Sequence, residues 1–485
     1  MAVSTFKRGL KLDLRKNATE GKATEIFNNL KQAVIPVNQH FGAPNKPIVS
    51  EGDHVKQGQK IADSLAPGPM TVPVHASISG TVKKIEPRLL QNNIEGLCII
   101  IENSGTGETG GNDETDFLPP LDPFSCTKEE SLSRIREAGI IGMGGAGFPA
   151  HVKFNPPANK KIDIIIANGA ECEPFLTTDE TIMAEKPEDL VRGLSIVMNI
   201  TGVKKAMIGL EDNKEKLIPV LQKEIGKVSG QIEISIGLCK SAYPQGGEKM
   251  LIKALTGREV PSGGLPMDAG CIVSNVRTLA AVAQAFAGRP VIERDLTVAG
   301  GACGKPKNIR VPIGTVLTDL PQEFLDIKYS EIRKIIFGGP MMGFALPAVS
   351  VPIQKNTSGI LLLTNREIFS YEEGPCIRCA RCIRNCPCSL SPVVMNNALD
   401  SGEFDEAVTA GLLDCIECGT CSYVCPARIK LTQRFRTGKQ RFKLKQQNTA
   451  SASAEANSEA ARADAQQNKR ISEFFKDKQD AAPEK

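Results

Sequence analysis

Residues 376–387 read C-I-R-C-A-R-C-I-R-N-C-P, and residues 415–426 read C-I-E-C-G-T-C-S-Y-V-C-P. The two runs share the pattern C-x-x-C-x-x-C-x-x-x-C-P. Three thiolates from a tight loop, joined by a fourth from elsewhere, allow a short stretch of chain to surround one metal core. The paired runs therefore predict a metal-binding unit.

This spacing is typical of iron–sulfur proteins with two clusters, in which the fourth cysteine of each run ligates the other cluster. We therefore assign one [4Fe-4S] cluster to Cys376, Cys379, Cys382 and Cys425, and a second to Cys386, Cys415, Cys418 and Cys421. Zinc is the alternative, because paired C-x-x-C units also suit tetrahedral thiolate coordination. Zinc leaves the second C-x-x-C step of each run and the terminal Cys-Pro unexplained. Cys388 is surplus, and we expect a small buried residue or a loop thiol there.

Composition and charge restrict the class of protein. A chain of 485 residues suggests about three domains. A net charge of +4 is too small to indicate a nucleic-acid binder. No apolar run is long enough to span a bilayer, and the N-terminal residues contain no apolar signal segment. Because eight of the 15 cysteines lie in the paired runs and the others are scattered, we expect a reducing, cytoplasmic environment.

A small all-β unit is predicted at residues 31–101, after an N-terminal arm at 1–30. Short β-branched runs there are separated by Gly-Asp and Gly-Gln turns. The pattern resembles the barrel-sandwich hybrid of lipoyl and biotin carriers. Those carriers attach their cofactor to a lysine, and no lysine lies between Ile61 and His75. We therefore expect a docking or structural unit, followed by a linker at 102–128 that is rich in Gly, Asp, Glu, Thr and Pro.

Strands and amphipathic helices alternate from Glu129 onward. This alternation predicts a parallel α/β layer, on which ligands bind at the carboxyl ends of the strands. Four glycines form a candidate phosphate cradle there, Gly142, Gly144, Gly145 and Gly147, although a tight turn would explain them equally well. Lys153 is either a charge for a phosphate or a solvated surface lysine. The loop at 168–174 follows a strand and is either a ligand-binding or a capped turn.

Four motifs follow one another along the chain: GIIGMGGAGFPAHVKF at 139–154, NGAECEP at 168–174, YPQGGEK at 243–249 and SNVRT at 274–278. In this order they resemble the flavin and NADH site of the flavin subunit of respiratory complex I. The chain also contains VAGGACGKPKNIRVPIGT at 298–315 and FGGPMMG at 337–343. With these and the cysteine runs, residues 31–440 resemble the RnfC family, the electron-entry subunits of ion-translocating ferredoxin:NAD oxidoreductase complexes.

The resemblance implies a set of site residues. The FMN phosphate and ribityl chain would be held by Gly142, Gly144, Gly145, Gly147 and Lys153. The flavin would be bound by Asn168, Glu171 and Asn275, and its phosphate contacted by Thr278. The nicotinamide cofactor would face Phe148, Glu173 and Glu248. Met143 stands where the complex I pattern has Arg, and Ala170 where it has an acid, so weaker FMN retention or NADH affinity is expected.

The resemblance also implies a multidomain α/β fold with additional small β and all-α units. Four domains are expected: the barrel-sandwich-hybrid domain at 31–101, a Rossmann-like FMN/NADH domain at 129–290, a β-grasp (SLBB-type) domain and connection at 291–365, and a helical two-[4Fe-4S] ferredoxin domain at 366–440. Eight basic residues and no acid lie between Arg428 and Lys445, which predicts either a solvated helix face or a docking surface for an acidic partner or anionic membrane. Residues 441–485 form a basic, then disordered tail, in which 471–478 is a candidate short helix.

Three functions are consistent with these features. In the first, FMN exchanges hydride with NAD(H), and two [4Fe-4S] clusters relay single electrons to or from other subunits. A peripheral subunit of this type would lie at the cytoplasmic face of the bacterial membrane, with integral membrane subunits, a ferredoxin-like subunit and, indirectly, ferredoxin as partners. The second function is a cobalamin-reductase-type flavoenzyme with a corrinoid acceptor. The third is a non-catalytic adaptor that only connects clusters to partners.

Overall fold

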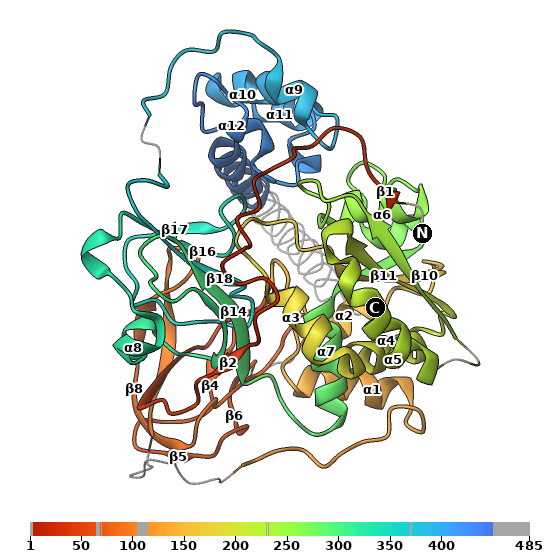
Figure 1. Ribbon diagram of the computed structural model, residues 1–485, viewed down its shortest axis with the longest axis vertical. Helices are drawn as coiled ribbons and strands as arrows, with labels where there is room; N and C mark the ends of the chain where they lie inside the picture. The colour runs from red at the N-terminus through yellow and green to blue at the C-terminus, as the bar shows by residue number, and fades with distance from the viewer. Residues whose placement is uncertain are drawn as a thin grey trace, which may run out of the picture. The chain divides into compact units, whose positions relative to one another are not determined.

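The computed structural model describes residues 3–64, 68, 70–103, 115–228, 230, 232–368 and 371–449 (Figure 1). The chain forms two compact units. The larger unit contains residues 1–372 together with the short segments 385–387 and 418–420, and the smaller unit contains 373–384, 388–417 and 421–485. The centre of the expected linker and the candidate helix at 471–478 lie outside the described residues.

The larger unit contains a five-stranded sheet with parallel pairing. Its strand order is β1-β12-β11-β10-β13. These strands are β1 (Val3–Ser4), β10 (Ile164–Gly169), β11 (Lys205–Glu211), β12 (Glu233–Cys239) and β13 (Cys271–Asn275). The pairing confirms the predicted parallel α/β layer. It also shows that the N-terminal arm supplies an edge strand, which the sequence did not indicate.

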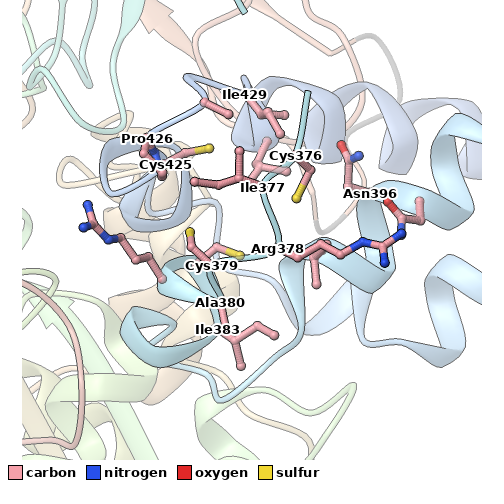
Figure 2. Close-up of a pocket in the computed structure, with 16 residues that line it drawn as sticks. Cys376, Ile377, Arg378, Cys379, Ala380, Ile383, Asn396, Cys425, Pro426 and Ile429 are labelled. Carbon is pink, nitrogen blue, oxygen red and sulfur yellow. The ribbon is translucent and has the colours of Figure 1, made fainter. Parts of the chain in front are cut away.

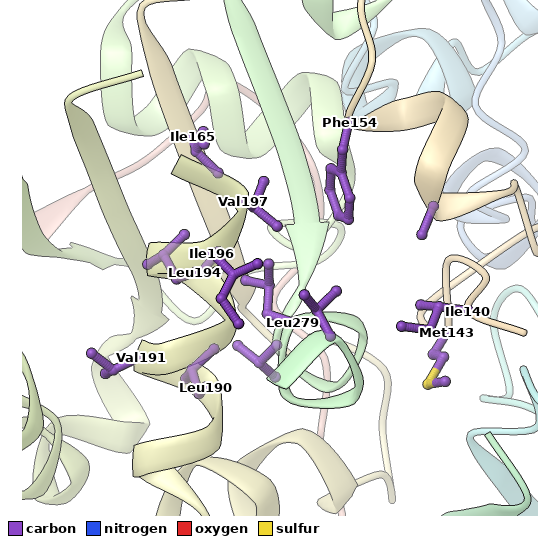
Figure 3. Packing of buried hydrophobic residues seen from close by; sticks show 14 of the residues in the cluster. Ile140, Met143, Phe154, Ile165, Leu190, Val191, Leu194, Ile196, Val197 and Leu279 are labelled. Carbon is purple, nitrogen blue, oxygen red and sulfur yellow. The ribbon is translucent and has the colours of Figure 1, made fainter. Parts of the chain in front are cut away.

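Helices cover both faces of this sheet. Since successive strand residues point in opposite directions, each strand contributes side chains to a core on either side. Ile165 packs in a core with helices α1, α4, α5 and α7, whereas its neighbour Ile166 packs with α6 on the other face. Figure 3 shows the first of these cores, including Ile165, Val197 and Leu279. The helices of this layer are α1 (Lys128–Glu137), α2 (Ala150–Lys153), α3 (Thr178–Glu185), α4 (Pro187–Thr201), α5 (Ile218–Lys227), α6 (Glu248–Thr256) and α7 (Val276–Phe286).

Local signals explain where these helices begin and end. Thr127 forms a capping box with Glu130 at the start of α1. Pro187 occupies the first turn of α4, where a missing N–H does no harm, and Gly202 ends that helix in the left-handed conformation. Asn275 caps α7 by accepting a hydrogen bond from the Arg277 N–H. The cap matters for function because Asn275 is also a predicted site residue.

The remaining strands of the larger unit form three further sheets. A six-stranded mixed sheet has the order β17-β16-β18-β14-β15-β2, and sheets of four and three strands have the orders β3-β9-β8-β5 and β4-β6-β7. The six-stranded sheet comprises β2 (Glu25–Ile26), β14 (Glu293–Ala299), β15 (Lys307–Pro312), β16 (Lys334–Phe337), β17 (Phe344–Leu346) and β18 (Gly359–Leu363), with α8 (Gln322–Leu325) beside it in sequence. The small sheets comprise β3 (Gln32–Pro36), β4 (Lys46–Pro47), β5 (His54–Val55), β6 (Lys60–Asp63), β7 (Val74–His75), β8 (Gly80–Leu89) and β9 (Glu95–Asn103). They confirm the predicted all-β unit.

The described part of the smaller unit is helical and contains no strand. Its helices include α9 (Arg381–Asn385), which ends in the segment assigned to the larger unit, α10 (Pro392–Asp400), α11 (Phe404–Thr409), α12 (Thr420–Tyr423) and the helical residues 431–449. Met395, Leu412 and Phe435 form its core. This arrangement confirms the predicted helical environment of the cysteine runs. Within the described residues, no helix is both long and apolar enough to cross a membrane.

Six of the eight residues of the basic segment lie on the helix at 431–449, and several of the charges are paired within the smaller unit. Arg434 contacts Asp400 at 2.9 Å, and Arg436 and Lys439 contact Glu417 at 3.1 and 2.8 Å. Surface ion pairs of this kind each contribute little to stability. These pairs nevertheless neutralise part of the positive charge within the unit. The docking surface predicted from the sequence would therefore be smaller than its eight basic residues suggest.

Candidate functional site

One cavity in the smaller unit brings together the first predicted set of cluster ligands. Cys376, Cys379, Cys382 and Cys425 all line a cavity of ≈ 350 Å³, with apolar neighbours that include Ile429 and Leu431 (Figure 2). Burial raises the pKa of the Cys382 thiol, and the nearby Cys379 and Cys425 raise it further. A cationic metal core would favour the thiolate form of Cys382 and offset this effect of burial.

The two cysteine runs also share an unusual backbone conformation. Arg378 and Ala380 have positive φ angles of 54° and 58°, and the equivalent positions of the second run, Glu417 and Gly419, have 56° and 80°. Positive φ is uncommon for residues other than glycine and is found where surrounding structure or function requires it. The repeated conformation indicates that the two runs form the same kind of loop.

The second set of predicted ligands is distributed differently. Cys386 and Cys418 belong to the larger unit, whereas Cys415 and Cys421 belong to the smaller one. Burial raises the pKa of the Cys418 thiol, and Cys386 contributes in the same direction. Among the described residues, no three His, Cys, Asp or Glu side chains are arranged to hold a single metal ion. The ligand sets of both clusters therefore stay predictions. Cys388 is half-buried.

Two predicted flavin ligands lie side by side at the carboxyl edge of the parallel sheet. Asn168, near the end of β10, is paired in register with Asn275, which ends β13. The Asn168 Nδ2 donates a hydrogen bond to the Gly246 carbonyl oxygen at 2.8 Å, and the Asn275 Nδ2 donates to Asp179 Oδ2 at 2.8 Å. The edge is where ligands bind to parallel sheets. The structure thus brings the 168–174, 243–249 and 274–278 motifs together.

The glycine-rich loop packs against this edge. Gly144 and Gly145 are exposed, and a Cβ on Gly144 would lie 2.8 Å from the Asn275 amide nitrogen, so a side chain there would displace Asn275. Gly147 has φ +71°. The hydroxyl of Thr278 is buried and accepts the Met143 N–H at 2.9 Å. Thr278 therefore supports the loop from the protein interior, and its contact with a phosphate stays a prediction.

The other predicted residues surround the same edge. Lys153 Nζ lies 2.5 Å from Glu248 Oε1, and Phe148 stacks on Phe41 with ring centroids 6.2 Å apart. Glu173 accepts hydrogen bonds from the Met341 and Met342 backbone N–H groups at 3.0 and 2.9 Å. Burial raises the pKa of Glu173 to about 7, despite these two bonds. A carboxyl group that is partly protonated at neutral pH is unusual and is a feature of functional sites.

Two buried side chains have unsatisfied polar atoms that suit a ligand. Glu171 Oε1 accepts the Asp179 N–H at 2.8 Å, but its Oε2 is buried without a hydrogen-bond partner. Both amide atoms of Gln245 are also buried without a partner. Buried polar groups are rarely left unpaired, so these atoms and the exposed glycine backbone fit a hydrogen-bonding cofactor such as FMN. Gln245 was not among the predicted site residues. Its position inside the YPQGGEK motif was the only feature of the sequence that pointed to a role in the site.

The flavin-site motifs also reach a cysteine of the second run. Tyr243 is buried, and its hydroxyl donates a hydrogen bond to the Cys418 carbonyl oxygen at 2.6 Å. Both residues belong to the larger unit. The turn that contains Gln245 therefore begins at a residue in direct contact with a predicted cluster ligand.

Comparison with known proteins assigns the three regions. The Nuo51 FMN-binding domain matches residues 135–284, the RnfC barrel sandwich hybrid domain matches 4–106, and the 4Fe-4S dicluster domain matches 368–426. The C subunit of the proton-translocating ferredoxin:NAD(+) oxidoreductase complex of Clostridium ljungdahlii is 42% identical over 437 residues, which cover 90% of this chain and 93% of that protein. The chain belongs to the RnfC family.

Two other relatives, both C subunits, agree with this membership of the RnfC family. The C subunit of the Na(+)-translocating ferredoxin:NAD(+) oxidoreductase complex of Acetobacterium woodii is 38% identical, with 84% of this chain and 90% of that protein covered. The C subunit of the ion-translocating oxidoreductase complex of Rhodobacter capsulatus is 36% identical, with 91% and 84% covered. A chain of the NAD+-reducing [NiFe]-hydrogenase in the H2-reduced state aligns with a TM-score of 0.47 and 19% identity, covering 66% of this chain and 62% of that one.

These matches confirm the flavin and iron–sulfur predictions for this RnfC-family chain at the level of whole domains. It is an oxidoreductase subunit with an FMN-binding domain and a 4Fe-4S domain. The individual ligand residues, the number of clusters and the domain boundaries stay predictions.

Proposed function

We propose that the protein is the peripheral subunit through which electrons pass between NAD(H) and an ion-translocating membrane complex. In this function FMN exchanges hydride with NAD(H), and two [4Fe-4S] clusters relay single electrons to or from other subunits. The observation that carries the proposal is the 2.6 Å hydrogen bond from Tyr243 to Cys418. It joins a turn of the predicted flavin site to a predicted cluster ligand within one compact unit.

FMN, when bound, supplies the conversion between two-electron hydride transfer and one-electron transfer to iron–sulfur clusters. The protein's own residues would position it. The backbone N–H groups around Gly144 and Gly145 are open to an anion, and Lys153 would leave Glu248 to neutralise part of a phosphate charge. Asn168, Glu171 and Asn275 would orient the flavin at the sheet edge.

The nicotinamide would approach from the side of Phe148, Glu173 and Glu248. Phe148 would offer an aromatic ring to the nicotinamide, and its stacking on Phe41 would hold that ring in place. Glu173 is held in place by two backbone N–H groups, so its carboxyl group would be presented to the cofactor in one orientation.

The cavity between the cysteines of the smaller unit would hold the first cluster. Ile429 and Leu431 in its wall would limit access of water, and exposure to water is one of the factors that set a cluster's reduction potential. The second cluster would be held by Cys386, Cys415, Cys418 and Cys421, and the shared backbone conformation of the two runs supports an equivalent loop there.

The names of the relatives support the cellular role. They are the C subunits of ferredoxin:NAD(+) oxidoreductase and ion-translocating complexes. We therefore propose integral membrane subunits and a ferredoxin-like subunit as partners, with the protein at the cytoplasmic face of the membrane. We also propose that the parallel layer is a Rossmann-like FMN/NADH domain at 129–290 and that the six-stranded sheet is a β-grasp (SLBB-type) domain at 291–365.

Anaerobic reconstitution tests the proposal directly. The purified protein should contain about eight iron and eight sulfide per chain, as two cubane clusters require, together with one FMN. Adding NADH should bleach the flavin absorbance and produce EPR signals of reduced clusters. Flavin binding with no bleaching by NADH would contradict the proposed donor. Clusters without any bound flavin would instead favour the adaptor that only connects partners.

A further inference from the structure

The N-terminal arm, residues 3–30, runs across the loops of the predicted flavin site. Leu10 pairs with Tyr243 through two backbone hydrogen bonds of 2.8 and 2.7 Å. Further along, the Leu14 carbonyl oxygen accepts the Phe175 N–H at 2.7 Å. The arm therefore contacts the YPQGGEK turn and the residue that follows the NGAECEP loop. It lies outside the matched FMN-binding domain, which begins at residue 135.

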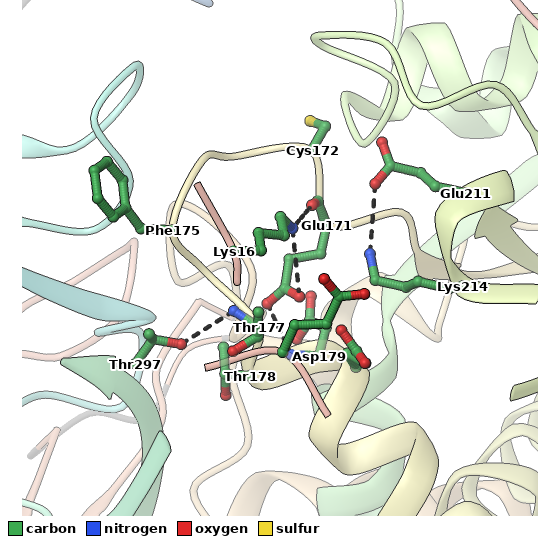
Figure 4. A network of polar contacts seen from close by, with 12 residues as sticks. Lys16, Glu171, Cys172, Phe175, Thr177, Thr178, Asp179, Glu211, Lys214 and Thr297 are labelled. Carbon is green, nitrogen blue, oxygen red and sulfur yellow. Dashed lines mark hydrogen bonds and ion pairs between the residues drawn. The ribbon is translucent and has the colours of Figure 1, made fainter. Parts of the chain in front are cut away.

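Lys16 is the residue of the arm that enters the site. Its side chain is only 3% exposed, and its Nζ donates a hydrogen bond to the Glu171 carbonyl oxygen (Figure 4). The same Nζ lies 3.8 Å from Glu171 Oε2, the buried oxygen that has no hydrogen-bond partner. One lysine thus contacts both the backbone and the carboxylate of a predicted flavin ligand.

The charges around Glu171 explain why a cation is needed there. Asp179 lies next to Glu171, and burial together with the Glu171 charge raises the pKa of Asp179. A second buried lysine, Lys214, is 3.4 Å from Glu211. Burial lowers the pKa of Lys16, and Lys214 lowers it further, while Glu171 opposes both. Lys16 is therefore held in the interior by Glu171, in spite of the penalty for burying its charge.

Attachment of the arm does not explain the lysine. Thr19 anchors the following residues, because the Thr177 hydroxyl donates to it at 2.8 Å, and β1 anchors the preceding ones through its pairing with β12. An apolar residue of similar length at position 16 would fill the same volume without burying a charge. The distinctive contribution of Lys16 is its charge and its hydrogen bond to Glu171.

We infer that Lys16 is a positioning residue of the cofactor site: it holds the Glu171 backbone and carboxylate for flavin binding, so that the N-terminal arm completes a site otherwise built by the α/β layer. This inference rests on the proposed flavin site at the sheet edge. It assigns the arm a role in cofactor affinity and flavin potential in addition to its strand pairing.

The test uses the full-length protein, freed of FMN and titrated with FMN by fluorescence quenching. Lys16→Met should weaken FMN binding by about tenfold or more, because the carboxylate loses the cation beside it and the loop carbonyl loses its donor. Lys16→Arg should restore much of the affinity. Lys11→Met, which changes an exposed lysine of the same arm, should bind FMN like the unaltered protein.

A double-mutant cycle separates positioning from general stabilisation. In a Glu171→Gln background, Lys16→Met should weaken FMN binding by a clearly smaller factor than in the unaltered protein, because the charge that Lys16 compensates is gone and only its hydrogen bond to the residue 171 carbonyl oxygen is lost. The flavin midpoint potential should also become more negative in Lys16→Met, since removal of a nearby cation disfavours added electrons. Lys16→Gln, which keeps a hydrogen-bond donor, serves if Lys16→Met does not fold.

The outcomes distinguish this inference from the proposed function. If the unaltered protein binds FMN and the folded Lys16→Met or Lys16→Gln protein binds it equally well with the same potential, the role of Lys16 is refuted and the flavin site stands. An equal loss with and without Glu171→Gln would also refute positioning through Glu171. If the unaltered protein binds no FMN, the proposed function itself fails.

Discussion

Gly193 in α4 offers a quantitative test of how the helical layer positions the flavin site. A Cβ at this position would lie 1.8 Å from the Leu279 carbonyl oxygen of α7, whereas ordinary contacts begin near 3.4 Å. Gly193→Ala must therefore separate the two helices by about 1.6 Å or distort one of them. The obstacle is backbone, which cannot rotate away, so the substitution should destabilise the layer.

The magnitude follows from two opposing terms. Overpacking a close contact typically costs about 1–3 kcal/mol, and this contact lies at the severe end of that range. Alanine is favoured over glycine in a helix by about 1 kcal/mol, which offsets part of the loss. We expect a net destabilisation of about 2 kcal/mol, corresponding to a decrease of about 4–8 °C in the midpoint of thermal unfolding.

Gly226→Ala provides the matched control, because Gly226 lies in α5 and a Cβ there meets nothing within 4 Å. This control should gain about 0.5–1 kcal/mol from helix propensity alone. Thermal unfolding followed by far-ultraviolet circular dichroism compares the two proteins. Since α7 is capped by Asn275 and has Thr278 in its first turn, Gly193→Ala should also weaken FMN binding, whereas Gly226→Ala should not. Equal unfolding midpoints for the two variants would refute the packing argument.

Three further predictions concern the site. Burial raises the Glu173 pKa from 4.5 to about 7, so this carboxyl group stabilises the fold below pH 4.5 and loses that contribution as the pH rises through 7. Between pH 5 and 8, the unfolding midpoint of Glu173→Gln should therefore rise relative to that of the unaltered protein. A difference between the two midpoints that does not change with pH would contradict the raised pKa. Cys379→Ser should remove about half of the bound iron by chemical assay, whereas Cys126→Ser should leave it unchanged. Gly144→Ala should weaken FMN binding by displacing Asn275. A Cβ at Gly145 meets no atom within 4 Å, so Gly145→Ala should change the affinity less. Equal FMN affinities of the two variants would show that the glycine loop does not pack as described.

Much of the architecture was predictable because its signals are local. The parallel layer followed from alternating strands and helices. The four cysteines predicted to ligate the first cluster line one cavity. Three of them are close in sequence through their C-x-x-C spacing, whereas Cys425 was assigned from the pairing of the two runs. The order of the flavin-site motifs likewise predicted the region of the chain that forms the carboxyl edge of the sheet.

The predictions were incomplete where segments far apart in the chain meet. The sequence of the N-terminal arm showed no strand alternation, yet β1 joins the parallel sheet and β2 joins the six-stranded sheet. The contact of the Thr278 hydroxyl with the Met143 N–H was likewise not apparent from the sequence, because 135 residues separate the two. Four of the eight basic residues near the end of the described chain, Arg434, Arg436, Lys439 and Lys445, pair with acids that precede them by about 20 to 60 residues.

The sequence by itself determined which groups are available to cofactors: the paired cysteine runs, the glycine loop and the polar strand ends. Only the tertiary structure decided which residues compensate one another. Lys16 and Glu171 are 155 residues apart, and Tyr243 and Cys418 are 175 apart. Contacts of this kind leave no periodic pattern along the chain, because they form only once strand pairing and burial have brought distant backbones together.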